Sequence, residues 1–77
     1  MQTEIMARGT VKFWKSDKGW GAISSPELPE GHDAWAHFSD IIATGFRELH
    51  PGDEVECTLV QRKQDSFDFC ATAIRKL

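Results

Sequence analysis

The sequence has no long apolar segment, which argues against a membrane-spanning or secreted protein. No apolar run approaches the roughly 18 residues of a membrane-spanning helix. The N-terminus MQTEIMARG has Glu4 where a secretory signal has a basic region, and no apolar stretch follows it. Only two cysteines occur, Cys57 and Cys70, and they lack a CxxC spacing. We therefore expect a cytoplasmic protein that does not bind membranes and that keeps two buried thiols.

Motifs for catalysis and metal binding are also missing. No GxxxxGK[ST] or GxSxG stretch occurs, and the scattered carboxylates do not identify an acid and a base. The histidines and cysteines do not have the ligand spacing of a CxxC or HxxxH site. We therefore expect no enzyme activity, no metal and no cofactor.

An overall basic charge is lacking as well. The net charge is −3, which by itself argues against a partner rich in phosphate. The distribution is uneven, because residues 19–56 hold eight acids and a single cation, Arg47. The segment 8–18 instead holds four cations and one acid: Arg8, Lys12, Lys15, Lys18 and Asp17. Charge alone favours an ordinary solvated surface, but it leaves one basic segment available to a nucleic acid.

The strongest signal that is present is that of β-strands. Apolar residues make up 40% of 77 residues, enough for one compact domain. Residues 39–46 have room only for a short helical turn with Ser39 as its N-cap, since Gly45 interrupts it. Five runs rich in β-branched and aromatic residues alternate with turn residues, at 7–15, 20–25, 33–38, 53–63 and 66–76. We predict an all-β fold, a small five-stranded antiparallel barrel over residues 7–77, after a flexible extension over residues 1–6.

Side-chain alternation predicts an aromatic outer face on this barrel. Trp20 lies on the strand face opposite Ile23, and Trp35 and His37 lie opposite the alanines beside them. Small residues and Ile23 suit the inside of a tight barrel. The large rings are therefore expected outside, where neighbouring strands bring them together.

The first strand adds positive charge to this face. The same alternation places Lys12 and Trp14 outside and Val11 and Phe13 inside. Bases of single-stranded nucleic acid stack on exposed rings, typically for about 1–3 kcal/mol per base, while cations lie near the phosphates. The alternative is that the rings form a second small core under the loop 26–32, or that the strand parity slips by one residue.

Two motifs carry a resemblance to a known family. Residues 9–23, GTVKFWKSDKGWGAI, resemble the first two strands of bacterial cold-shock proteins. KGWGAI matches the first ribonucleoprotein motif of that family and DAWAHF the second, and the similarity continues through FSDI, TGFREL and PGDEV. The resemblance implies a five-stranded oligonucleotide-binding barrel (OB-fold) that binds single-stranded RNA and DNA. Some members act as RNA chaperones or transcription antiterminators, and we expect a monomer.

The resemblance also assigns roles to individual side chains. Lys12 and Lys18 match basic positions, and Asp33 matches an acid that accepts hydrogen bonds from bases. Base contacts are implied for seven rings: Phe13, Trp14, Trp20, Trp35, His37, Phe38 and Phe46. For Phe13 and Phe38 this overrides the alternation, which a bulge or the coiling of a small barrel would change.

The sequence departs from the family pattern in several places. Residues 13 and 14 read Phe-Trp where Trp followed by Phe or Tyr is usual, and Trp20 stands where Phe is usual, but these changes keep aromatic rings. Ala22 stands where a further stacking ring is usual, so we expect one base subsite to be lost and Ala22→Phe to restore it. The loop 24–32 is longer than the family turn, and residues 61–69 replace a glycine-rich loop. Within the second loop, Arg62 and Lys63 are expected either to bind phosphate or to form a solvated hairpin tip.

Three classes of function stay open at this point. Binding of single strands is favoured over a barrel that presents its rings to a peptide and over a nuclease-like enzyme. An RNA-recognition-motif sheet shares a KGxGx-type signature, but the sequence does not predict the two amphipathic helices of that fold.

Overall fold

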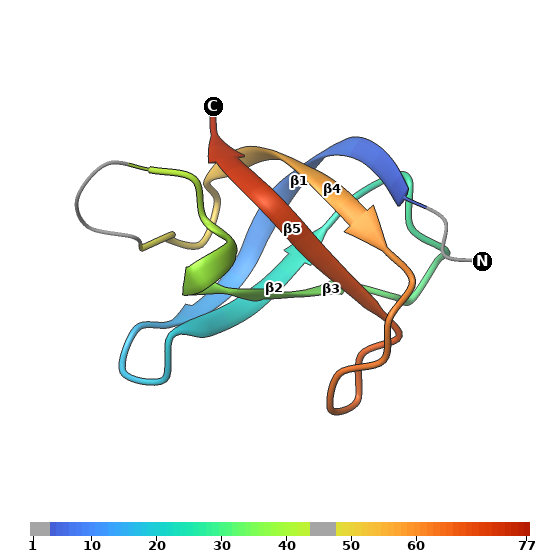
Figure 1. The fold of residues 1–77 in the computed structure, drawn as a ribbon, viewed down its shortest axis with the longest axis horizontal. Coiled ribbons are helices and arrows are strands. Elements are labelled where there is room, and N and C mark those ends of the chain that lie inside the picture. The colour runs from blue at the N-terminus through green and yellow to red at the C-terminus, as the bar shows by residue number, and fades with distance from the viewer. Residues whose placement is uncertain (1–3, 44–47) are drawn as a thin grey trace.

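The computed structural model describes residues 4–43 and 48–77 and shows a closed β-barrel (Figure 1). Its elements are β1 (Glu4–Lys15), β2 (Trp20–Ser24), β3 (Ala34–His37), the 3₁₀ helix η1 (Phe38–Asp40), β4 (Glu54–Val60) and β5 (Phe69–Lys76). The strands neighbour one another in the order β1-β2-β3-β5-β4, and β1 closes the barrel on β4. The predicted all-β, five-stranded barrel is confirmed, with one parallel pair, β3 and β5, among antiparallel ones. No helix in the described part of the chain is long and apolar enough to cross a membrane.

Strand β1 begins earlier than the sequence pattern indicates. Glu4 pairs with Val60 and Ile5 pairs with Leu59, so the strand extends along the whole of β4. Residues 4–6, which the sequence assigned to an N-terminal extension, thus form part of β1. The side chains of these residues are exposed, and only their backbone pairing reveals the strand.

A bulge in β1 reverses the side-chain parity within that strand. Val11 pairs with Ile23, but Phe13 pairs with Ala22, so Lys12 is an extra residue in the ladder. After the bulge, Phe13 lies on the outer face and Trp14 packs against the core. The alternation count was wrong for both residues, because it assumed a regular strand. The turn before β4 supports the bulge, since the Val11 N–H donates to the Asp53 carbonyl at 2.8 Å.

Apart from Ile23, the inner faces of β2 and β3 carry very small side chains. Gly21, Ala34 and Ala36 are buried, and the alanines belong to the core. A Cβ on Gly21 would overlap the Trp14 ring and the Phe13 carbonyl. Glycine is therefore needed at this position so that the Trp14 indole can lie close to β2, its cross-strand neighbour.

The helical turn after β3 begins before the expected residue. Helix η1 covers Phe38–Asp40, and its N-cap is His37, whose Nδ1 accepts a hydrogen bond from the Ser39 N–H at 3.3 Å. The predicted cap at Ser39 is wrong, because the His37 imidazole, two residues earlier, supplies the acceptor. Residues 44–47 lie outside the described residues.

The β4–β5 hairpin, residues 61–68, is an ordered projection from the barrel (Figure 1, orange). Gln64 and Phe67 exchange two backbone hydrogen bonds, of 2.9 and 2.8 Å, across a two-residue turn. Asp65 in that turn has φ of 54°, a left-handed conformation that aspartate tolerates better than most residues. Arg62 and Lys63 are exposed, in agreement with both alternatives for this segment.

Candidate nucleic-acid interface

The outer faces of β1, β2 and β3 bring the predicted rings side by side. Cross-strand pairing places Trp20 opposite His37 and Ala22 opposite both Phe13 and Trp35. Residues opposite each other on neighbouring strands are close enough for their side chains to touch. We call Phe13, Trp20, Ala22, Trp35 and His37 the aromatic face. All except Ala22 are partly exposed and lie outside the barrel core, so a ligand can reach their side chains.

Trp35, His37 and Phe38 form a continuous row of rings. The Trp35 and His37 rings are nearly parallel, with 5.6 Å between centroids and an interplanar angle of 18°. The His37 and Phe38 centroids are 4.5 Å apart, and the Phe38 side chain is strongly exposed. A hydrogen bond of 2.8 Å between His37 Nδ1 and Ser39 Oγ holds the imidazole in place. Flat, fixed rings of this kind are suited to stacking of unpaired bases.

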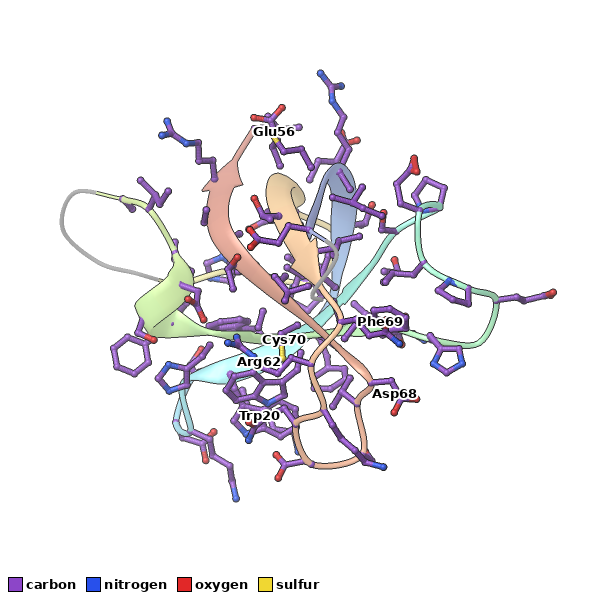
Figure 2. The ribbon with its side chains drawn as sticks, turned by 45° about the vertical axis from the view of Figure 1, so that its right-hand side comes forward. Trp20, Glu56, Arg62, Asp68, Phe69 and Cys70 are labelled. Atoms are coloured by element: carbon purple, nitrogen blue, oxygen red, sulfur yellow. The ribbon has the colours of Figure 1, made fainter. Side chains whose placement is uncertain are left out.

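Trp20 lies at the centre of a second group of rings. Its ring meets Phe13 edge-to-face at 5.7 Å and Phe67 edge-to-face at 6.2 Å between centroids. Lys15 Nζ is 5.3 Å from the Trp20 ring, within the range of a cation–π contact. Figure 2 shows Trp20 beside the β4–β5 hairpin, which provides Phe67. Phe67 and Lys15 were not predicted as site residues.

Ala22 is enclosed on the aromatic face. Its exposed fraction is 0%, although its side chain points away from the barrel core. The larger rings of Phe13, Trp20 and Trp35 surround it on its own and the neighbouring strands. The expected open subsite above Ala22 is therefore not present, because a ring introduced there has to displace a neighbour.

The cations near the aromatic face are few. Lys12 Nζ forms an ion pair with Asp33 Oδ2 at 2.9 Å, and the Lys12 side chain is largely exposed. Asp33 thus has a cation beside it, and a base that binds to this carboxylate has to share or replace Lys12. Lys18 is exposed in the turn between β1 and β2. These positions provide positive charge without forming a large basic surface.

The β4–β5 hairpin covers the side of the aromatic face nearest β5. Cys70 pairs with Trp35 across the parallel strands and is 1% exposed, and its Sγ donates to the Arg62 carbonyl at 3.4 Å. Trp35 Nε1 is buried and finds no hydrogen-bond partner within residues 4–43 and 48–77. Leaving such a donor unpaired destabilises a fold by about 1–3 kcal/mol. The indole N–H therefore gains a hydrogen bond if an acceptor comes within reach.

Comparison with known proteins agrees with this geometry. The family model described as "'Cold-shock' DNA-binding domain" matches residues 7–68. This chain belongs to the cold-shock domain family. It is 45% identical over 56 residues to cold shock protein ScoF of Streptomyces coelicolor, covering 73% of this chain and 81% of that protein.

Two further cold-shock proteins show similar agreement. The major cold shock protein of Streptococcus pyogenes is 46% identical over 50 residues, which are 65% of this chain and 70% of that protein. Cold shock protein CspB of Geobacillus stearothermophilus is 41% identical over 56 residues, or 73% of this chain and 80% of that protein. Membership of the cold-shock domain family supports nucleic-acid binding as the function of this chain.

The cold-shock domain brings most of the predicted site residues together, with two exceptions. Trp14 is turned toward the core by the bulge, as described above, so its ring is not part of the aromatic face. Phe46 lies outside the described residues, and its role stays a prediction. Within the described residues, no group of three His, Cys, Asp or Glu side chains is arranged to hold a metal ion.

Two titratable groups outside the aromatic face have shifted pKa values. The His50 backbone N–H donates to the Asp53 carboxylate and Lys76 lies beside it, and together these lower the pKa of Asp53 despite some desolvation. Burial, with a smaller effect of the nearby Glu56 charge, raises the pKa of Cys57 to about 11. Both groups are structural: Asp53 holds the turn that supports the bulge, and Cys57 lies in the core.

Proposed function

We propose that this chain binds single-stranded RNA and DNA by stacking unpaired bases on its aromatic face. The observation that carries the proposal is the outward placement of Trp20, Trp35 and His37 on two neighbouring strands. Lys15 Nζ lies 5.3 Å from the Trp20 ring, in a protein whose net charge is negative. Stacking, rather than neutralisation of phosphate, is therefore the main source of affinity.

The proposed roles divide the site into rings, cations and one acceptor. Phe13, Trp20, Trp35, His37 and Phe38 stack bases or contact their edges. Lys12 and Lys18 lie near phosphates, and Asp33 accepts hydrogen bonds from base amino or imino groups. The Trp14 ring packs against the core and affects binding only through the shape of β1. For Phe46 we keep the base contact that the family resemblance implies.

A fluorescence titration tests this function directly. Two of the three indoles lie on the aromatic face, so binding of a pyrimidine single strand is expected to quench intrinsic tryptophan fluorescence strongly. A duplex of the same length, in which the bases are already stacked and paired, is expected to cause little quenching. Absence of quenching by single strands of RNA and DNA would rule out the proposal, and shortening of the oligonucleotide with time would indicate a nuclease.

In the cell, we propose that the protein acts as an RNA chaperone or a transcription antiterminator. Capture of unpaired segments shifts an RNA hairpin toward its open form without any chemical step. The expected result is that stoichiometric protein increases the opening of a fluorophore-labelled RNA hairpin and increases read-through at a hairpin terminator in a purified transcription reaction. We also propose a cytoplasmic monomer, which light scattering and cell fractionation test.

A further inference from the structure

Position 22 leaves the aromatic face without a ring at its centre. Ala22 lies between Phe13 and Trp35 across the strands and two residues from Trp20 along its own strand. Such a gap is expected to leave a methyl group open to solvent. The structure shows the opposite, because Ala22 is completely buried.

Phe67 brings a ring to this part of the molecule from another element. It lies on the β4–β5 hairpin, 45 residues after Ala22 in the sequence. Its ring meets Trp20, the neighbour of Ala22 on the aromatic face, at 6.2 Å and 81°. An edge-to-face contact leaves at least one face of each ring free of the other.

The position of Phe67 is held on both sides by the surrounding chain. On one side is the two-residue turn, closed by the paired backbone hydrogen bonds with Gln64. On the other, Asp68 Oδ2 is 3.4 Å from His32 Nδ1, so the two loops that depart from the family pattern contact each other. A ring that is already ordered loses little conformational entropy when a ligand binds.

Phe67 is also reachable from outside. It is one of the residues that line a mainly polar cleft of about 130 Å³, with Gly31, His32, Asp33, Ser66 and Asp68. The ring is only partly buried, in contrast to Ala22. A base can therefore approach Phe67 from the cleft while the next base in the strand lies on Trp20.

We propose that Phe67 is a base-stacking residue, which supplies from the β4–β5 hairpin the ring that position 22 lacks. This inference rests on the proposed function and adds a residue and an element to the binding site. The competing possibility is that Phe67 only covers Trp20 and has to be displaced by the nucleic acid. The two possibilities predict opposite changes in affinity when the Phe67 ring is removed. Loss of a stacking ring weakens binding, whereas loss of a ring that only covers Trp20 strengthens it.

The test compares variants of one side chain in the full chain, with a pyrimidine single strand of DNA as the probe and calorimetry as the readout. Phe67→Ala is expected to weaken binding about five- to hundredfold, the range for one stacked base. Phe67→Leu keeps apolar volume but not the ring and is expected to weaken binding similarly, whereas Phe67→Tyr keeps the ring and stays within about twofold of wild type. Leu77→Ala, which removes an exposed apolar side chain outside both the aromatic face and this cleft, is the control and is expected to bind as wild type does.

A double variant tests whether the two ring positions are equivalent. Ala22→Phe alone is expected to give no tighter binding, because Ala22 is enclosed. With Phe67→Ala in the same chain, the space next to Trp20 is larger, and Ala22→Phe is expected to recover at least half of the lost affinity on a logarithmic scale. Circular dichroism confirms that each variant keeps its fold.

The outcomes separate this inference from the function on which it rests. If wild type binds no single strand, the proposed function fails. If wild type binds and Phe67→Ala binds equally or more tightly, or if Phe67→Leu binds as well as wild type, Phe67 does not stack a base. If the folded double variant shows no recovery, the ring of Phe67 does not replace the one missing at position 22.

Discussion

The inner and outer faces of β2 and β3 differ in side-chain size, with one exception on each face. Along the inner face are Gly21, Ala34, Ala36 and the larger Ile23, and along the outer face are Trp20, Trp35, His37 and the small Ala22. Small inner side chains let the strands of a narrow barrel approach its axis, while the outer face has no such limit. The comparison shows that barrel stability and ligand contact depend on different faces of the same two strands. Substitutions on the two faces should therefore have separable effects.

The largest effect is expected at Gly21, on the inner face. A methyl group there overlaps the Phe13 carbonyl and the Trp14 ring, so Gly21→Ala is expected to lower the free energy of unfolding by about 3 kcal/mol. Urea denaturation measures the change. A variant as stable as wild type would show that Trp14 does not need the close approach to β2.

The corresponding change on the outer face is Trp35→Ala. It removes a ring that stacks on His37 and is expected to weaken single-strand binding by about 1–3 kcal/mol while the barrel stays folded. The core residues Ala34 and Ala36 are unchanged in this variant. Titration and circular dichroism on the same sample check both halves of the prediction, and an unfolded variant would place Trp35 in the core.

Much of this difference between the inner and outer faces was predictable from the local sequence. Alternation placed Trp20, Trp35 and His37 outside correctly, because β2 and β3 pair in a regular register without a bulge. In β1 the same method failed, since a bulge is a property of the strand pair and Lys12 has no residue-level signature of one.

Other features depend on contacts between distant segments. The edge-to-face contact of Phe67 with Trp20 joins a hairpin to a strand far away in sequence, and no local pattern reports it. The only sequence signal for it was the replacement of a glycine-rich loop by a segment with two phenylalanines. The enclosure of Ala22 likewise follows from the size of its cross-strand neighbours and not from its own strand.

Salt dependence tests whether the outer face acts mainly through its rings. With Lys12, Lys18 and one further cation near phosphates, log affinity is expected to fall with log salt at a slope of about −2, from roughly −0.7 per single-strand phosphate contact. Lys18→Ala is expected to make the slope shallower by about 0.7. A slope steeper than about −4 would mean that phosphate neutralisation, and not stacking, provides most of the affinity.

Cys57 gives a smaller, pH-dependent effect on the inner side. Its pKa is raised to about 11 from a usual value near 9, so between these values the folded state keeps a proton that the unfolded state loses. Its contribution to stability is present below pH 9 and is lost as the pH rises toward 11, by at most about 1.4 kcal/mol per pH unit. Cys57→Ala is expected to flatten the alkaline decrease in urea stability, and an unchanged decrease would assign it to other groups.

The smallest expected effect compares this thiol with Cys70. Both are almost completely buried, but Cys57 belongs to the core, whereas Cys70 lies next to Trp35 beneath the β4–β5 hairpin. We therefore expect reaction of Cys57 with a thiol reagent to require unfolding of the barrel, and reaction of Cys70 to require local opening of the hairpin, which includes its contact with the Arg62 carbonyl. At pH 8 the single-cysteine variant Cys57→Ala, which retains Cys70, is expected to react faster than Cys70→Ala.

Because Phe67 belongs to the same hairpin, binding of a single strand that stacks on it is expected to slow the labelling of Cys70. Faster labelling on binding would show that the nucleic acid lifts the hairpin away from the aromatic face.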